Sequence, residues 1–556
     1  MASQPESSLP ERSKGEQGAE GAAPSKSALK KAAKEKEKAE KAAKRQQQEQ
    51  QEREKAAQND TASHLYGPMV YSSSSVPTGR YIEDLGDLNA VEEETKVTIE
   101  ARVYSTRKQS AKLSFLVIGE GDHTIQAVVA EGGEQKISRQ MIKWCGGINT
   151  ESIVRITGLV KKPFEEIKST SITKYELHVQ EIFMVSEAPE QLPIQRKDCN
   201  QPPPTEEEGN AEKEGLINVS LKGRLDNRVI SLRASAQQAI IELQSEVSFL
   251  FAEYMRKHKF KWIQPSYLAG AATEGGAGVF EIKYFETKAY LTQSPQFFKQ
   301  MAIAGDMKRV CINGPVFRAE NSNTKRHLTE FTGLDFEMTI QNHYHEVLSF
   351  GEQLMIFIIR ALQTRPECQH LVNIIKKAGY PEAGDFQLPP GDEAVRITFA
   401  EAKKMLKESG YDIGEDEMED IDTAQEKALG ALILSKHHTD FYTIDKYPRT
   451  LRPFYTHPDP TNPLLTNSYD FFMRGQEIMS GAQRIHNYDL LCQNMREKGL
   501  DPLAEGFRHY TDAFRYGCAP HGGGGLGLNR IVQFFLGLRD VREATLFPRD
   551  PGRLAP

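Results

Sequence analysis

The order of apolar and polar residues divides the chain into stretches of different character. Between residues 86 and 187, five short runs alternate apolar and polar positions, among them KVTIEARVYS and HTIQAVVAE, with turn residues such as GEGD between them. Such alternation is typical of strands that bury one face. Five short strands predict a small closed barrel, of which the OB-fold is the best-known example, and such barrels can bind single-stranded nucleic acid.

The pattern changes in the segment that follows. Residues 188–215 contain PPPTEEEGNAEKEG, which can neither bury a core nor continue a helix, and we interpret them as a linker. Residues 216–556 begin with a long helical pattern and continue with several alternating strands. Because strands and helices do not alternate as βαβ units, we expect an α+β domain with an antiparallel sheet. The acidic stretch at 365–435 is expected to be an insertion with solvated charges.

The first 85 residues are poor in apolar side chains and rich in Ala, Lys, Glu and Gln. A basic stripe at helical spacing, without an apolar face, is formed by Lys30, Lys34, Lys38, Lys41 and Arg45. Residues 1–85 are therefore expected to be a flexible extension with a basic helix, either a solvated tail or an arm that binds a polyanion. The N-terminus has no apolar leader region, which favours the cytosol.

Length, charge and cysteine usage narrow the function classes. With 556 residues the chain exceeds a single core, and no apolar run is long enough to cross a membrane. Its six cysteines include no CxxC pair, which argues against a disulfide framework and a cysteine zinc site. Because the net charge is -7, any contact with nucleic acid must come from local basic patches.

Charged residues gather on a predicted hairpin at residues 317–340. Arg318 and Glu320 share one strand face, and Asp335 and Glu337 share a face of the returning strand. One arginine and three carboxylates on one face are hard to bury without a ligand, although a structural ion-pair network is the alternative. An arginine fork fits a phosphate, and nearby carboxylates fit Mg²⁺ or an amine.

Two further segments carry candidate chemistry. The strand pattern at 468–486 contains Asp470, Glu477, Ser480 and Arg484. The glycine run of HGGGGLGLNR is expected to be a loop that leads into a helix with Arg530 in its first turns, because glycines allow close approach of a ligand and helix N-termini favour anions. No P-loop motif is present in the sequence.

These segments resemble the motifs of class II aminoacyl-tRNA synthetases. FRAENSNTKRHLTEFTGLDFEM is similar to motif 2, GGGGLGLNRIVQFFLGLRDVREATLFPRDPGRLAP to motif 3, and KHKFKWIQPSYL, with Pro265, to motif 1. The resemblance is greatest to the cytosolic aspartyl enzymes of eukaryotes. It extends over nearly the whole chain through SPQFFKQ, RPFYTHPDP, SYDFFMRG and SGAQRIH.

The resemblance implies an ATP site on the hairpin. Arg318 matches the contact to the α-phosphate and the amino acid carboxylate, and Glu320 the contact to the adenine amino group. Arg326 and His327 match groups near the β- and γ-phosphates, and Arg530 matches the arginine that packs on adenine. The full set of implied ATP contacts is Arg318, Glu320, Arg326, His327, Leu328, Glu477, Gly527, Leu528, Asn529 and Arg530.

The resemblance also implies an aspartate pocket and a magnesium site. Asp470 and Glu477 match the carboxylates associated with Mg²⁺. The implied aspartate contacts are Glu274, Gln296, Lys299, Arg318, Asp335, Ser480 and Arg484. Among them, Lys299 and Arg484 suit the side-chain carboxylate, and we expect two converging cations that repel each other until an anionic ligand arrives.

For tRNA, the resemblance implies contacts from the barrel and from the basic extension. Arg107, Phe115 and Gln126 match residues that contact the anticodon, with Phe115 as a stacking platform unless it is a residue of the barrel core. The segment with Lys30 and Lys34 matches a lysine-rich helix that assists tRNA binding. Motif 1 implies a homodimer.

The implied reaction is aspartate activation with ATP, followed by transfer to the 3′ end of tRNA(Asp). Two departures from the family pattern and two alternative assignments have to be weighed against it. Asn529 stands where many relatives have a glutamate, and the segment around Glu274 is about one residue longer than expected. Asparaginyl and lysyl enzymes share the layout, but a lysine pocket would need an acidic group where Arg484 stands. A catalytically silent RNA-binding paralogue is the alternative of another class.

Overall fold

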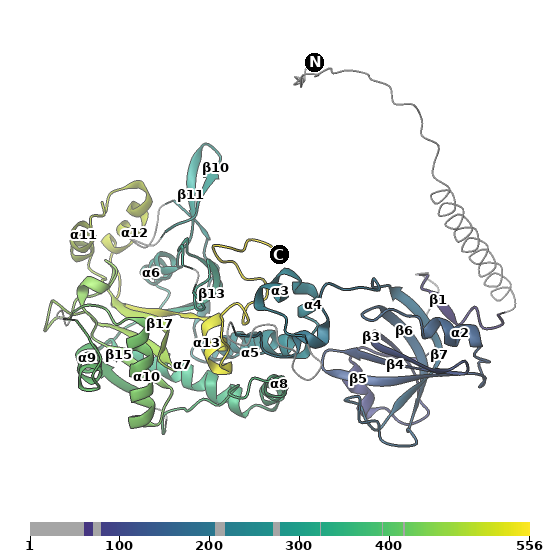
Figure 1. Cartoon of the computed structure of the whole chain (residues 1–556). Coiled ribbons are helices and arrows are strands. Elements are labelled where there is room, and N and C mark those ends of the chain that lie inside the picture. Colours follow the sequence, from purple (N-terminus) through teal and green to yellow (C-terminus); the bar gives the residue numbers. More distant parts are fainter. Residues whose placement is uncertain are drawn as a thin grey trace, which may run out of the picture. The chain divides into compact units, whose positions relative to one another are not determined.

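The computed structural model describes residues 60–70, 79–205, 217–270, 278–322, 324–391, 393–414 and 418–556. The chain divides into one compact unit that ends at Glu190 and a second from Gln191 to Pro556 (Figure 1). Among the residues with predicted roles, Glu274 and the whole basic stripe lie outside the described residues; the stripe consists of Lys30, Lys34, Lys38, Lys41 and Arg45. No helix in the described part of the chain is long and apolar enough to span a membrane.

The first unit is a closed barrel. β3 pairs with β4 and β6, β4 with β5, and β7 closes the circle by pairing with both β5 and β6. Along β3 the side chains of Val97, Ile99, Ala101 and Val103 are buried, as the alternating pattern predicts. This confirms the predicted OB-fold. Its elements are β3 (Lys96–Ser110), β4 (Leu113–Glu120), β5 (His123–Ala130), α2 (Arg139–Cys145), β6 (Ile153–Lys161) and β7 (Glu176–Ser186).

The barrel begins before residue 86. Two short strands, β1 (Tyr66–Pro68) and β2 (Arg80–Ile82), pair in parallel with β7 and β3, and the helical turn η1 (Leu85–Ala90) follows. Ala62, Leu65, Ile82 and Leu85 are buried in the same apolar core as the barrel strands. The predicted boundary at residue 86 is therefore too late, because these scattered apolar residues carry no alternation of their own.

The second unit is built on an eight-stranded sheet with the order β14-β15-β16-β17-β18-β13-β12-β8. Parallel pairing occurs only between β14 and β15 and between β12 and β8, and the other neighbours are antiparallel. The predicted antiparallel α+β fold is thus confirmed. The strands are β8 (Lys261–Trp262), β12 (Arg309–Phe317), β13 (Glu330–Thr339), β14 (Val395–Thr398), β15 (Phe441–Asp445), β16 (Ser468–Met473), β17 (Gln476–Arg484) and β18 (His521–Gly527).

Four helices share one large apolar core with this sheet: α5 (Ser235–Lys257), α7 (His345–Thr364), α8 (Pro366–Lys377) and α13 (Leu528–Leu536). A small sheet with the order β10-β11-β9 projects from the unit (Figure 1). Its strands are β9 (Leu268–Ala269), β10 (Glu281–Tyr284) and β11 (Thr287–Leu291). The remaining elements are η2 (Arg196–Cys199), α3 (Leu221–Asp226), α4 (Arg228–Ser231), α6 (Gln296–Ala304), α9 (Phe399–Glu408), α10 (Thr423–His437), η3 (Arg449–Leu451), α11 (Tyr488–Glu497) and α12 (Glu505–Arg515).

Two expectations about this unit were wrong. The stretch at 365–435 is not a separate insertion, because α8 packs in the main core and β14 extends the sheet. The glycine run is not a loop but β18, which lies between β17 and β13. A Cβ on Gly523 would lie 2.0 Å from the carbonyl oxygen of Phe336, so the neighbouring backbones approach too closely for a side chain there.

Candidate active site

The predicted charged hairpin is formed by β12 and β13. The two strands pair from Arg309 opposite Met338 to Phe317 opposite Glu330. Arg318 continues this pairing by one residue, because its backbone N–H donates to the carbonyl oxygen of Thr329 at 2.9 Å. Arg318 and Glu320 therefore lie just past the end of β12, at the start of the loop that joins β12 to β13.

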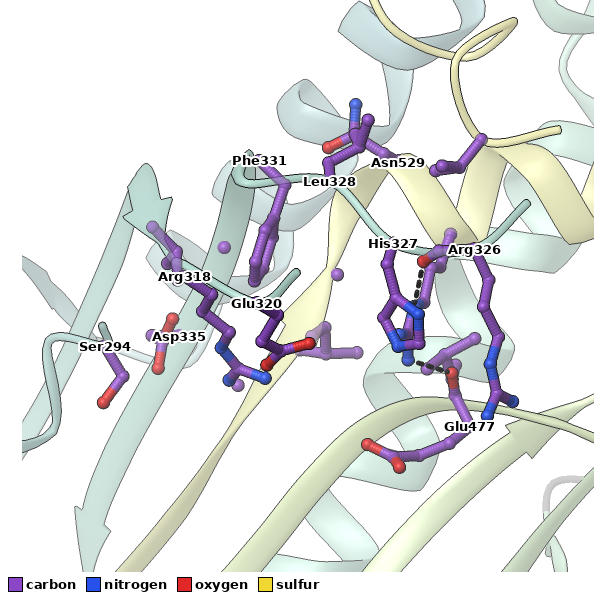
Figure 2. Close-up of a pocket in the computed structure, with 18 residues that line it drawn as sticks. Ser294, Arg318, Glu320, Arg326, His327, Leu328, Phe331, Asp335, Glu477 and Asn529 are labelled. Carbon is purple, nitrogen blue, oxygen red and sulfur yellow. Dashed lines mark hydrogen bonds between the residues drawn. The ribbon is translucent and has the colours of Figure 1, made fainter. Parts of the chain in front are cut away.

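A cavity opens beside this hairpin (Figure 2). It is lined by residues of the hairpin and its loop, of β17, and of β18 and the start of α13. Leu528, which was expected at this site, is buried and does not line the cavity. The expected residues that do line it are Arg318, Glu320, Arg326, His327, Leu328, Asp335, Glu477, Gly527, Asn529 and Arg530.

The charged side chains stand on two sides of the cavity. Figure 2 shows Arg318, Glu320 and Asp335 on one side and His327, Arg326 and Glu477 on the other. Arg530 connects the loop to β17, because its Nη1 donates to the carbonyl oxygen of Glu477 at 3.0 Å and its Nε to that of Arg326 at 3.3 Å. The space between these two groups of charged side chains can hold a polar, polyanionic ligand.

His327 and Asn529 are uncharged polar side chains of the site. Burial, with the positive charge of Arg530, lowers the pKa of His327, so this ring is neutral at neutral pH and offers hydrogen bonds rather than charge. Asn529 accepts a hydrogen bond from the backbone N–H of Thr332 and donates to the carbonyl oxygen of Ala544. The amide thus fills its place without an ion pair.

Arg326 does not extend freely into the cavity. Its Nη1 lies 2.7 Å from Oε2 of Glu426 and its Nη2 donates to Oγ1 of Thr423 at 2.6 Å, so helix α10 holds both ends of the guanidinium. Burial raises the pKa of Glu426 to about 7, although Arg326 opposes this shift. Glu426 was not predicted as a site residue, because it belongs to the stretch expected to have solvated charges.

Lys299 and Arg484 occupy a buried position next to the cavity. Lys299 Nζ lies 2.7 Å from Oδ1 of Asp335 and 3.6 Å from Oε2 of Glu337. Arg484 donates from Nε to Oε1 of Glu337 at 3.1 Å and from Nη2 to the carbonyl oxygen of Gly523 at 3.0 Å. The expectation of two unpaired cations was therefore wrong, because buried charges need partners. We call these four residues, Lys299, Asp335, Glu337 and Arg484, the charged quartet.

Glu337 is the member of the quartet that the site prediction omitted. Its carboxylate is fully buried between the two cations. Burial alone would raise the pKa of Glu337, but Arg484 and Lys299 outweigh this effect and hold it below its ordinary value. The alternating pattern of the hairpin placed Glu337 on the same face as Asp335, and that signal could have indicated its place.

The other predicted members of the amino acid pocket differ in their exposure. Asp335 also lines the cavity, so it joins the quartet to the open space. Gln296 is buried and donates from Nε2 to Oε1 of Gln300 at 3.1 Å. Ser480 is exposed on β17, and its Oγ accepts a hydrogen bond from Nη1 of Arg452 at 2.9 Å.

Asp470 and Glu477 are the two carboxylates of the predicted magnesium site. Asp470 Oδ2 accepts from Nη2 of Arg452 at 2.7 Å, while Oδ1 is buried without a hydrogen-bond partner among the described residues. Within the same residues, no group of three or more His, Cys, Asp or Glu side chains could hold a metal by itself. Two carboxylates fit Mg²⁺, which commonly takes its remaining ligands from water and substrate phosphates.

The predicted tRNA contacts of the barrel lie on adjacent strands. The guanidinium carbon of Arg107 is 4.9 Å from the ring centroid of Phe115, and Gln126 donates from Nε2 to Oε2 of Glu176 at 3.2 Å. Phe115 is half-buried and lies outside the apolar core, whereas its neighbour Leu116 belongs to the core. The alternative of Phe115 as a core residue is thus excluded.

Comparisons with known proteins agree with this geometry. Residues 220–551 match the family described as tRNA synthetases class II (D, K and N), and residues 97–185 match the OB-fold nucleic acid binding domain. The cytoplasmic aspartate–tRNA ligase of Homo sapiens is 44% identical over 500 residues, which are 90% of this chain and 96% of that protein. The corresponding protein of Caenorhabditis elegans is 41% identical over 503 residues, 90% of this chain and 92% of that protein.

Solved structures lead to the same group. An aspartyl-tRNA synthetase from Entamoeba histolytica is 40% identical, with a TM-score of 0.77, and the match covers 88% of this chain and 96% of that one. An asparaginyl-tRNA synthetase from Pyrococcus horikoshii is 28% identical, with a TM-score of 0.68 over 84% and 97% of the two chains. The chain belongs to the class II aminoacyl-tRNA synthetases of the D, K and N group. Within that group it is a member of the aspartate–tRNA ligase family.

Proposed function

We propose that this enzyme acts as a cytosolic aspartate–tRNA ligase. It joins L-aspartate to ATP, releases pyrophosphate, and transfers the aspartyl group to the 3′ end of tRNA(Asp). The charged quartet beside the cavity is the observation that carries the proposal, because it offers donors for an amino acid side chain that only accepts hydrogen bonds. Relatives that are named cytoplasmic support the location.

The cavity is the nucleotide half of the proposed site. Arg318 meets the α-phosphate, Glu320 accepts from the adenine amino group, and Arg530 stacks on the base. Arg326 and His327 face the β- and γ-phosphates, for which Arg326 has to leave Glu426 or share its fork with the phosphate. Leu328, Gly527 and Asn529 line the walls around these contacts.

The quartet is the amino acid half of the proposed site. The α-ammonium group of aspartate pairs with Asp335, and its side-chain carboxylate accepts from Lys299 and Arg484. Glu337 balances the two cations before the substrate binds, so the empty pocket stays folded. Asparagine would direct an NH₂ group at these donors and leave it unpaired, which disfavours it.

Catalysis in this proposal needs no nucleophilic side chain. The aspartate α-carboxylate attacks the α-phosphorus of ATP, and the arginines hold the reacting groups in line and offset the developing charge. Asp470 and Glu477 are the residues that would hold magnesium, which when bound neutralises phosphate charge. Glu274 and Gln296 complete the amino acid contacts.

Partner binding forms a further part of the proposal. Arg107, Phe115 and Gln126 form the anticodon face of the barrel, and Lys30 and Lys34 belong to a basic arm that adds phosphate contacts. A homodimer forms through motif 1, in which Trp262 of β8 is 45% exposed, together with the preceding helix α5, in which Phe249 is 67% exposed. Large exposed apolar residues on adjacent elements favour such an interface.

The test is ATP–pyrophosphate exchange with each of the twenty amino acids in turn. Aspartate should support exchange, and asparagine and lysine should be disfavoured by about 10⁴, the selectivity that polar pairing can reach without editing. Exchange driven equally by asparagine would exclude the proposed pocket. A complete lack of exchange, with tRNA binding retained, would favour the silent paralogue.

A further inference from the structure

The loop that joins β15 to β16 carries two residues that contact the proposed amino acid site. Arg452 reaches Ser480 and Asp470, and the guanidinium carbon of Arg484 lies 5.5 Å from the ring centroid of Tyr455. Both residues belong to the segment RPFY, whose individual residues had no predicted role. The loop thus contacts residues of the proposed amino acid site through Arg452 and Tyr455.

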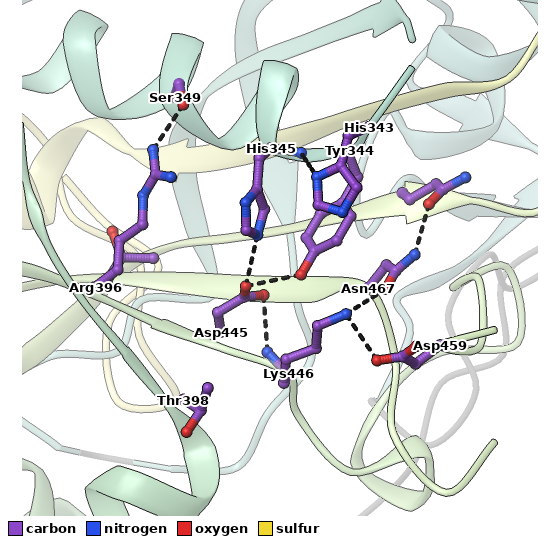
Figure 3. Close-up of polar contacts among 12 residues, drawn as sticks. His343, Tyr344, His345, Ser349, Arg396, Thr398, Asp445, Lys446, Asp459 and Asn467 are labelled. Atoms are coloured by element: carbon purple, nitrogen blue, oxygen red, sulfur yellow. Dashed lines mark hydrogen bonds and ion pairs between the residues drawn. The ribbon is translucent and has the colours of Figure 1, made fainter. Parts of the chain in front are cut away.

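A polar network fixes the base of this loop (Figure 3). Lys446 has a left-handed backbone with φ of +62°, and its Nζ donates to Oδ2 of Asp459 at 2.7 Å and to Oδ1 of Asn467 at 2.8 Å. Asp445 accepts from the hydroxyl group of Tyr344 at 2.7 Å, and His345 Nε2 lies 2.9 Å from the same carboxylate. Because both ends of the loop are held, Arg452 is presented in a fixed position.

Arg452 itself joins two neighbouring strands. Its Nη1 donates to Ser480 Oγ at 2.9 Å and its Nη2 to Asp470 Oδ2 at 2.7 Å. Asp470 of β16 and Ser480 of β17 are direct partners in the sheet. The guanidinium carbon lies 3.8 Å from the ring centroid of Tyr447, so the fork is also held from its face.

Stability alone does not account for this arrangement. Arg452 Nε and Asp470 Oδ1 are buried, and neither has a hydrogen-bond partner among the described residues. A buried ion pair that leaves polar atoms unsatisfied contributes little net stability, because the loss of hydration offsets the attraction. The incomplete pairing is better explained by a ligand-binding role of the groups that Arg452 holds.

The hydrogen bond to Ser480 has a fixed direction. A guanidinium only donates, so Ser480 Oγ accepts from Arg452, and the Ser480 hydroxyl proton can donate either to the carboxylate of Asp470, its partner across the sheet, or to a ligand. Ser480 is exposed on its strand, so this proton can reach a ligand. A carboxylate that only accepts is the matching group.

We infer that Arg452 is a positioning residue that sets Ser480 as a hydrogen-bond donor to the side-chain carboxylate of aspartate and fixes the Asp470 carboxylate beside it. This inference rests on the proposed function and deepens it. Arg452 does not need to touch the substrate. It acts through Ser480, so the two residues should be coupled in aspartate binding.

The test measures the Kd of L-aspartate by calorimetry, without ATP or magnesium, together with the melting temperature. Arg452→Gln and Ser480→Ala should each raise the Kd about tenfold, the loss of roughly one charge-assisted hydrogen bond. The double variant should be no weaker than the weaker single variant. Arg452→Lys should have a melting temperature near that of the wild-type protein. It should nevertheless bind aspartate as poorly as Arg452→Gln, because an ammonium group cannot contact Ser480 and Asp470 at the same time as a guanidinium does.

Arg449→Gln is the matched control. Arg449 lies in the same loop, but its guanidinium contacts Asn494 and Glu497 of α11, so its loss should leave the aspartate Kd unchanged. The inference is overturned if Arg452→Gln binds aspartate within twofold of wild type, or if the effects of Arg452→Gln and Ser480→Ala multiply in the double variant. Failure of wild type to catalyse aspartate-dependent exchange would instead refute the proposed function.

Discussion

The charged quartet of the catalytic unit and the proposed anticodon face of the barrel differ in how their charged side chains are exposed. In the quartet, Lys299 is 1% exposed and Arg484 is 4% exposed, and each is paired with a buried carboxylate. On the barrel face, Arg107 is exposed and covers the half-buried ring of Phe115. One region encloses its charges and the other presents them to solvent.

This difference determines what each region can do. Buried, mutually paired charges discriminate strongly, because a ligand with the wrong hydrogen-bonding group leaves a polar atom unpaired in a poorly hydrated space. Exposed cations and aromatic rings give affinity that tolerates variation and weakens with salt. Substitutions in the quartet should therefore change activity and stability together, and substitutions on the barrel face should change tRNA binding alone.

The largest effect is expected for Arg484→Leu. It removes the fork proposed to hold the aspartate side chain, so kcat/KM for aspartate in pyrophosphate exchange should fall by about 10⁴. It also leaves Glu337 buried with only Lys299 at 3.6 Å, so the free energy of unfolding should fall by about 3–5 kcal/mol. Exchange kinetics and urea unfolding measure the two effects.

A double variant separates the two consequences. Adding Glu337→Gln to Arg484→Leu removes the stranded carboxylate and should restore most of the lost stability but none of the aspartate activity. Arg484→Lys should rescue activity poorly, because an ammonium cannot reproduce the fork. Near-normal aspartate activity in Arg484→Leu would show that the quartet is not the amino acid pocket.

On the barrel face, Phe115→Ala should affect only the tRNA step. Loss of base stacking amounts to about 1–3 kcal/mol, which corresponds to roughly 5- to 150-fold in kcat/KM for tRNA. Pyrophosphate exchange should be unchanged. Leu116→Ala is the matched control, because this adjacent side chain lies in the core and its loss should reduce stability by about 2–5 kcal/mol. A fall in melting temperature for Phe115→Ala would contradict the contrast between the two positions.

Removal of the basic extension should make tRNA binding less dependent on salt. Removal of residues 1–50 leaves Asp60 in place, whose carboxylate accepts from the backbone N–H of Ala62 and the hydroxyl group of Tyr66. Each lost phosphate contact should reduce the log–log salt slope of tRNA binding by about 0.7–0.9, which is about threefold in affinity over a fourfold range of salt. An unchanged slope would favour the solvated-tail interpretation.

The smallest effect is expected for Glu426→Gln in the nucleotide cavity. The folded pKa of Glu426, about 7, lies above its ordinary value of 4.5, so its contribution to stability is present below pH 4.5 and is lost as pH rises through 7. Above that pKa the carboxylate faces Arg326, Glu477 and Arg530 and competes with phosphates for Arg326. Glu426→Gln should therefore lower KM for ATP about two- to threefold one pH unit above the pKa, the range of a partly exposed ion pair.

The pH dependence provides the control for this variant. One unit below the pKa, wild-type Glu426 is mostly protonated, so wild type and Glu426→Gln should have the same KM for ATP. Steady-state kinetics at both pH values measures the difference. A higher KM in the variant at both values would mean that Glu426 orients Arg326 for the nucleotide rather than competing for it.

The sequence by itself determined the parts of this protein that depend on local patterns. Alternation predicted the barrel strands and the hairpin of β12 and β13, and motif resemblance indicated Arg318, Glu320 and Arg530, which line one cavity. These features depend on residues that are close in the chain, where side-chain direction follows from backbone geometry. The glycines of β18 predicted a loop, because their use in close strand packing depends on neighbouring strands that the local sequence does not show.

Only the tertiary structure decided how the charges are balanced. Glu337 neutralises Arg484 across 147 residues of sequence, and Glu426 holds Arg326 across 100. Arg452 reaches Asp470 and Ser480 only because the loop from β15 folds back onto the sheet. Sequence patterns can indicate that a residue is charged, but packing decides which partner compensates it, because a buried charge is stable only where the fold supplies an opposite charge or a hydrogen bond.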